Sequence, residues 1–155
     1  MRALVVTFIM TTAALSLESA PAGFNLWRSS ELHTLENKLS RELDSQKVAS
    51  QRLGTYGNHT MGIARREGTG NAEFHETQND IFIVQSGEAT LIEGGTLVDP
   101  RTTELHEVEG TSITGGNKRK LAAGDIVHIP FKTPHQLIVD SGKQITYFVV
   151  KIDAQ

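Results

Sequence analysis

Four side chains with nitrogen or oxygen donors are spaced so that they could meet at one point. Glu73, His75 and Asp80 lie close together just ahead of an apolar run, and His135 begins another apolar run much further along the chain. Residues two apart on a strand share a face, so Glu73 and His75 should point the same way. Asp80 can return beside His75 across the intervening turn. Imidazoles and carboxylates gathered in this way indicate a site for a divalent metal ion.

The elements that would position these groups are one helix followed by short strands. Leucines at helical spacing predict an amphipathic helix over roughly 30–46, packed on the rest of the protein; they are Leu32, Leu35, Leu39 and Leu43. From Val48 onward, short apolar runs alternate with turn residues, which is typical of strands. Strands are expected near 48–53, 60–66, 71–76, 81–85, 88–93, 111–114, 118–121, 126–129, 135–139 and 145–151.

Turn residues divide these strands. Ser86-Gly87 is expected to form a tight hairpin between the strands at 81–85 and 88–93. The less regular stretch 94–109 should extend a hairpin beside the site, either as a loop that sets specificity or as an ordinary surface excursion. About eight to ten short antiparallel strands suit a closed barrel or jelly roll. The sequence therefore predicts an all-β body.

Composition narrows the classes of function. The chain has 155 residues and a net charge of −3, and its positive residues cluster only at Lys118-Arg119-Lys120. Nucleic-acid binding needs a basic face, so nucleic acid is not an expected partner. The chain contains no cysteine, which excludes disulfides, thiolate metal sites and a cysteine nucleophile.

The first 22 residues have the pattern of an export signal. Arg2 precedes an apolar stretch from Ala3 to Leu17, and Ala20-Pro21-Ala22 offers small residues for cleavage after Ala22. The alternative is a membrane anchor, but the stretch is shorter than the ~20 residues that span a bilayer. We therefore expect a signal peptide (1–22), an N-terminal extended segment with the helix (23–46) and a barrel domain (47–155). The mature protein should be periplasmic or secreted and not membrane-bound.

Residues 60–150 resemble the two sequence motifs of the cupin superfamily, in its small single-domain form (the cupin-2 conserved barrel). The first motif has a His-x-His pair, then a glutamate, then a glycine. His75, Asp80 and Gly87 stand at the second histidine, the glutamate and the glycine. Glu73 replaces the first histidine.

The second motif corresponds to residues 124–135. Gly124, Pro130 and His135 match its glycine, proline and histidine, while Lys132 stands where a glycine is typical. The resemblance implies an all-β cupin double-stranded β-helix, a jelly-roll barrel, with one N-terminal amphipathic α-helix. It also implies a metal inside the barrel and a homodimer.

The ligand set departs from the family pattern of three histidines and one glutamate. His75 and His135 are the expected metal ligands. Asp80 is one methylene shorter than glutamate, so it would ligate directly or through water, and Glu73 would either ligate or act as a general base. Such a set suits one divalent transition metal, with Mn or Fe favoured over Zn or Ni. The alternative is that these residues are solvated strand ends without a metal.

Two classes of function remain open. The resemblance implies a metal-dependent enzyme of the oxygenase, isomerase or lyase type. We expect it to act on a small polar or acidic molecule, with Glu73 or Asp80 assisting proton transfer and Glu73 as the catalytic residue. The alternative is a non-catalytic periplasmic protein that binds a small ligand or a metal. The fold serves both classes, so it does not decide between them.

Overall fold

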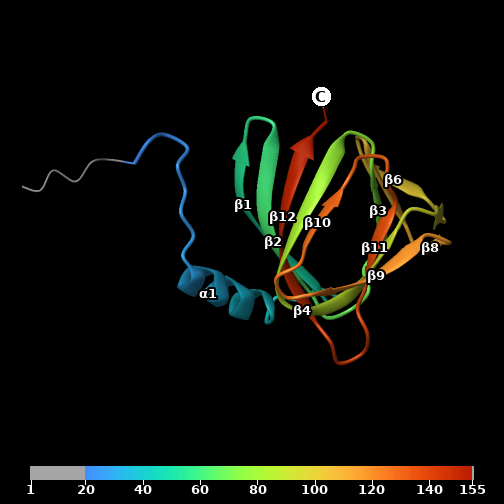
Figure 1. Cartoon of the computed structure of the whole chain (residues 1–155), viewed down its shortest axis with the longest axis horizontal. Coiled ribbons are helices and arrows are strands. Elements are labelled where there is room, and N and C mark those ends of the chain that lie inside the picture. Colours follow the sequence, from blue (N-terminus) through green and yellow to red (C-terminus); the bar gives the residue numbers. More distant parts are fainter. Residues whose placement is uncertain (1–19, 155) are drawn as a thin grey trace, which may run out of the picture.

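The computed structural model describes residues 20–154 (Figure 1). Residues 1–19 of the predicted export signal lie outside this range. Within 20–154, no helix is long and apolar enough to span a bilayer. The described chain forms one helix and twelve strands.

The helix α1 (Ser29–Leu39) lies outside the curled sheet, against β1 and β2 (Figure 1). At its start, the Glu31 carboxylate accepts the backbone N–H of Arg28 at 2.6 Å, and its negative charge suits a helix N-terminus. Leu35 and Leu39 pack against Ala49 and other residues of a small second core. The predicted packing of this face is confirmed.

The helix is shorter than the predicted range of 30–46. It ends at Leu39, and turn residues follow. Leu43 still joins the second core, but from the segment after the helix. The spacing of the leucines therefore predicted correctly which face of the helix is buried. It placed the end of the helix too far along the chain.

The strands alternate with short turns throughout the rest of the chain. Every strand segment predicted from the sequence overlaps a strand of the structure. They are β1 (Val48–Tyr56), β2 (His59–Arg66), β3 (Ala72–His75), β4 (Gln78–Glu93), β5 (Thr96–Val98), β6 (Arg101–Glu104), β7 (Glu107–Gly110), β8 (Ser112–Thr114), β9 (Asn117–Ala122), β10 (Ile126–Ile129), β11 (His135–Ile138) and β12 (Ile145–Asp153).

The long strand β4 belongs to two layers. Its first part pairs with β12 and β10, and it extends the order β1-β2-β12-β4-β10. Its last part pairs with β9 and β11, in the order β9-β4-β11-β3-β7-β6. A short β5–β8 ladder forms a separate sheet that contacts β7 and β11. All the ladders are antiparallel, and the layers curl into a half-barrel (Figure 1).

The predicted hairpin at Ser86-Gly87 is wrong, because β4 runs on through both residues. Gly87 has a φ of +77°, and a Cβ there would collide with the backbone oxygen of Gln144. The β4–β12 register shifts between Thr146 and Tyr147, which marks a bulge beside the glycine. The Ser86-Gly87 pair, which was predicted to form a hairpin, thus forms a bend through which β4 passes from the first layer to the second.

The main core lies between the layers. Along β4, Phe82 and Val84 face inward with Asp80, while Ile83 is 39% exposed on the outer face. The inward apolar side chains form one cluster: Ala64, Phe82, Val84, Ala89, Leu91, Leu121, Ile129, Leu137, Val139, Ile145 and Tyr147. Within 20–154 the strand order ends at β1 and β6, so the barrel is not fully closed. The predicted all-β jelly roll with one helix is confirmed.

Candidate metal centre

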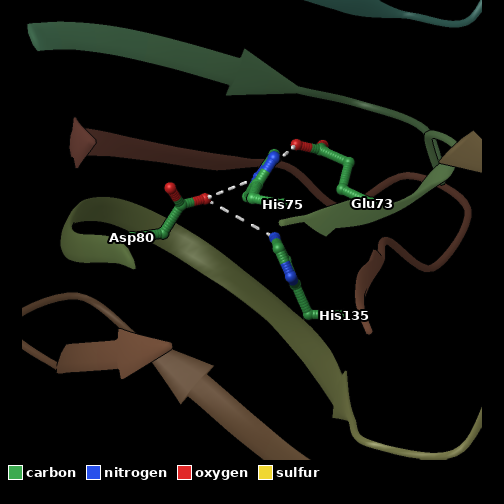
Figure 2. Close-up of side chains that lie close together, drawn as sticks. All are labelled: Glu73, His75, Asp80 and His135. Carbon is green, nitrogen blue, oxygen red and sulfur yellow. Dashed lines mark ion pairs between the residues drawn. The ribbon is translucent and has the colours of Figure 1, made fainter. Parts of the chain in front are cut away.

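The four predicted site residues lie together between the two layers. Each offers one nitrogen or oxygen atom, and these atoms are within 4.8 Å of one another. Figure 2 shows Glu73 and His75 projecting from β3 toward Asp80 on β4, with His135 on β11 completing the group. One layer thus supplies both histidines, and the other supplies the aspartate between them.

The Asp80 carboxylate lies at the centre of this group, close to both histidines. Its Oδ2 lies 3.3 Å from His75 Nε2 and 3.5 Å from His135 Nε2, and Glu73 Oε2 lies 3.6 Å from His75 Nε2. The two imidazole centroids are 5.2 Å apart. His75, Asp80 and His135 are nearly fully buried, with exposures of 4%, 1% and 3%. The group is therefore part of the interior and not a set of solvated strand ends.

In both imidazoles, the ring nitrogen on the side away from Asp80 is hydrogen-bonded. Nδ1 of His75 is hydrogen-bonded to the Glu107 carboxylate, and Nδ1 of His135 donates to the backbone carbonyl of Thr133 at 3.0 Å. A proton on Nδ1 leaves the Nε2 lone pair free. Nε2 of each ring lies toward Asp80, and a histidine whose Nδ1 proton is held by a carboxylate or a backbone carbonyl is typical of metal sites.

Glu107 was missed by the sequence analysis. It lies on β7, within the stretch 94–109 that was expected to be either a specificity loop or a surface excursion. In the structure, β6 and β7 form a hairpin that pairs with β3, and Glu107 lies opposite His75. The sequence offers no local signal for this contact, because it depends on the register between β3 and β7.

Two cationic side chains enter the group from the first layer, and both were missed. Lys151 Nζ, from β12, lies 2.8 Å from His75 Nε2 and 3.4 Å from Asp80 Oδ1. The Arg66 guanidinium, from β2, donates to Glu73 Oε1 at 2.7 Å and to the Tyr147 hydroxyl at 3.0 Å. Lys151 stands in step with Tyr147 and Val149, which pack in the main core, whereas Phe148 packs in the second core. The two-residue period of a strand was the available signal for an inward lysine.

These contacts set the pKa values, and so the protonation states, of the Asp80 and Glu73 carboxyl groups. Burial alone would raise the pKa of Asp80, but the neighbouring imidazoles of His135 and His75 and the charge of Lys151 lower that pKa far below its ordinary value. Burial likewise acts to raise the pKa of Glu73, and the charge of Arg66, followed by those of His135 and Lys151, lowers it. Both carboxylates are therefore ionised at neutral pH.

The pKa of His75 is shifted in the other direction. Burial alone lowers the pKa of the imidazole, and the charge of Lys151 acts in the same sense. The close contact with Asp80 and the charges of Asp80 and Glu107 outweigh both, so the pKa of His75 is raised. This imidazole therefore holds a proton more strongly than a free imidazole does.

Two buried atoms of the group show that it suits a cation. Asp80 Oδ1 and His135 Nε2 have no hydrogen-bond partner within residues 20–154. A buried acceptor left without a partner costs about 1–3 kcal/mol, so such atoms are rare in folded proteins. A carboxylate oxygen and an imidazole nitrogen are both ordinary ligands for a divalent transition metal. The residues present therefore fit a metal ion.

The turn before His135 depends on the backbone conformation of Lys132. It has a φ of +59°, the left-handed conformation that glycine adopts most readily. Its backbone N–H donates to the carbonyl of His75 at 2.7 Å, so the turn is tied to β3. The side chain is exposed, with Nζ 5.4 Å from the ring centroid of Phe131. Lys132 thus adopts a conformation that would suit the glycine typical of the motif at this position.

No protein-family model matches the chain, and no curated protein matches it in sequence. Solved structures do match. A cupin-2 conserved barrel domain protein from Salinispora arenicola is 20% identical over 72% of this chain and 80% of its own, with a TM-score of 0.50. A cupin-like protein from Thermotoga maritima is 18% identical over 68% of each chain, with a TM-score of 0.50.

A third match is a polyketide cyclase from Streptomyces resistomycificus, 14% identical over 71% of this chain and 67% of its own, with a TM-score of 0.50. The chain therefore has the cupin fold, as the two motifs predicted. At these identities the likeness concerns the fold, so function has to be argued from the side chains of the site.

Proposed function

We propose that this protein binds one divalent transition metal between its two layers, through His75, His135 and Asp80. The observation that carries the proposal is a group with ionised carboxylates in which, across the described part of the chain, Asp80 Oδ1 and His135 Nε2 are buried without a hydrogen bond, Oδ1 having only the Lys151 ammonium 3.4 Å away. Two imidazoles with oxygen ligands favour Mn or Fe over Zn or Ni.

The chemistry follows from this set of ligands. A bound metal of this class supplies a Lewis acid or a centre for dioxygen. Glu107 and Thr133 hold the two imidazoles in the tautomer that ligates. Glu73 Oε2 faces the same space while Oε1 is bound to Arg66, so Glu73 is placed either to ligate or to take a proton from a bound molecule.

We further propose that the protein is an enzyme acting on a small polar or acidic molecule, of the oxygenase, isomerase or lyase type. Lys151 supports an acidic molecule, since its side chain is 28% exposed beside nearly buried ligands. The polyketide cyclase of the same fold supports small-molecule chemistry in such a barrel.

A non-catalytic binding protein is the second candidate, and one observation favours it. The Arg66 guanidinium lies 2.7 Å from Glu73 and contributes to the lowered pKa of that carboxyl. A carboxylate with a lowered pKa is a weak general base at neutral pH. Under this reading Glu73 only balances charge.

Elemental analysis of protein purified without chelator tests the metal site. We expect a stoichiometric transition metal in the wild type and its loss in both His75→Ala and His135→Ala. His106→Ala is the matched control, because His106 is an exposed histidine with a carboxylate partner, Glu76, 2.9 Å away. Wild-type protein that is metal-free and cannot be loaded with Mn(II) or Fe(II) would reject the proposal.

Export and dimerisation complete the proposal, and each has its own experiment. Residues 1–22 are proposed as the signal peptide of a periplasmic or secreted protein. Cell fractionation of the full chain beside a chain without residues 1–22 tests this, and equal retention inside the cell would reject it. Sedimentation equilibrium tests the proposed homodimer.

A further inference from the structure

Lys151 places a positive charge inside the proposed metal site. In the β4–β12 ladder Lys151 lies opposite Asp80, and its side chain turns inward between the two layers. Nζ lies 2.8 Å from His75 Nε2, and 3.4 Å and 3.5 Å from the two oxygens of Asp80. The ammonium thus contacts two of the three residues proposed to hold the metal.

The contact with His75 uses the atom that a metal would need. Nδ1 of His75 is engaged by Glu107, so Nε2 carries the remaining lone pair. An ammonium group has donors and no acceptor, and at 2.8 Å it donates to that lone pair. One lone pair cannot serve an ammonium proton and a metal ion at the same time.

The balance of charge leads to the same conclusion. Arg66 is engaged by Glu73 and the Tyr147 hydroxyl, which leaves Lys151 as the cation in contact with Asp80 within residues 20–154. A divalent ion beside Asp80 would repel the ammonium across a buried region, where charges interact strongly. The lysine side chain is 28% exposed, so it has a path toward solvent.

We propose that Lys151 is a built-in counter-cation that competes with the metal, and that a divalent ion binds only by displacing its ammonium from His75 and Asp80. Lys151 therefore sets how tightly the site holds a metal. This inference deepens the proposed function and rests on its metal site.

The experiment compares Lys151→Met with the wild type. Methionine keeps an unbranched apolar side chain of nearly the length of the lysine stem and removes the ammonium group. Lys132→Met is the matched control, since the Lys132 side chain is exposed and lies over Phe131 rather than in the ligand group. Mn(II) is titrated by calorimetry at fixed pH into metal-stripped protein. We expect Lys151→Met to bind Mn(II) at least about tenfold more tightly, because charged hydrogen bonds no longer have to be broken.

Thermal unfolding gives a second measurement. Metal-free Lys151→Met should have a lower Tm than the wild type, because Asp80 loses its counter-charge. Saturating Mn(II) should then raise the Tm of Lys151→Met by more than it raises that of the wild type, since tighter binding stabilises the folded state more. If Lys151→Met does not fold, Lys151→Gln keeps a neutral donor and tests the same expectation.

The outcomes separate this inference from the proposed function. Equal or weaker Mn(II) binding in Lys151→Met overturns the inference and leaves the metal site standing. Binding in Lys151→Met without binding in the wild type supports the inference and rejects a metal-dependent function for the natural protein. Binding in neither protein overturns both.

Discussion

Glu107 binds Nδ1 of His75 and thereby directs the opposite ring nitrogen of that histidine at Asp80. The two residues come from neighbouring strands, β3 and β7, so the orientation of this proposed ligand depends on a strand ladder. The β6–β7 hairpin is consequently part of the support of the site, although none of its residues belongs to the ligand group.

Glu107→Ala should weaken Mn(II) binding by about 10–100-fold, the usual cost of losing a carboxylate that orients a ligating histidine. Calorimetric titration measures the change. Glu109→Ala is the control, because Glu109 lies on the same strand and binds Asn71 rather than a ligand. Equal losses in the two variants would show that the hairpin acts through stability and not through His75.

The free energy of unfolding at acid pH should depend on Asp80. Its folded-state pKa lies below its ordinary value of 3.8, so its contribution to stability is complete above that value and is lost as the pH falls below it. Urea unfolding of metal-free protein between pH 6 and pH 3 should show this decline in the wild type.

The Asp80→Asn variant should show a flatter decline over the same range, because it lacks the titrating group. Asp153→Asn is the control, since Asp153 is an exposed carboxylate on β12, and it should keep the wild-type slope. Identical slopes in all three proteins would contradict the importance assigned to Asp80.

The bend at Gly87 should be intolerant of any side chain. Gly87→Ala combines a left-handed backbone, which costs about 1–2 kcal/mol, with a collision against the Gln144 backbone oxygen, so we expect a loss of more than about 2 kcal/mol in the free energy of unfolding. Gly142→Ala has the same φ of +77° and no atom within 4 Å of the new Cβ. It should lose only the backbone part, and equal losses would remove the collision from the explanation.

The errors of sequence interpretation share a physical cause. The pair Ser86-Gly87 predicted a hairpin because glycine with a positive φ serves tight turns and bulges alike, and the partners of β4 decide between them. Glu107, Arg66 and Lys151 were missed because each reaches the site through pairing between distant strands. A sequence read locally contains no record of such pairings.

The successes rest on local rules. Glu73 and His75 share a face because they are two apart on one strand, and Asp80 faces them because its strand alternates between a buried and an outer face. The placement of His135 needed the second cupin motif, since nothing local connects it to His75. What the motif could not give was the charge surrounding the ligands, which decides the strength of the site.

The turn at Lys132 should gain stability from the glycine that the motif leads one to expect. A lysine at φ +59° is strained by about 1–2 kcal/mol, and part of this gain is offset by the greater freedom of glycine in the unfolded chain. Lys132→Gly should therefore raise the free energy of unfolding by about 0.5–1 kcal/mol. Lys132→Ala, which keeps the strain, should not, and a gain in both would assign the effect to the lysine side chain instead.

Glu73 and Asp80 should differ in their importance for metal binding. Asp80 is 1% exposed and lies between both Nε2 atoms, whereas Glu73 has one oxygen bound to Arg66 and the other 3.6 Å from His75. Glu73→Gln should weaken Mn(II) binding by less than about tenfold, and Asp80→Asn by clearly more, because Glu73 is committed to a bidentate-capable arginine at hydrogen-bond distance whereas Asp80 faces only the longer contacts of Lys151. Calorimetric titration of both variants measures the difference. Comparable losses would make Glu73 a full ligand, and a negligible loss in Glu73→Gln would leave it free for proton transfer or for charge balance alone.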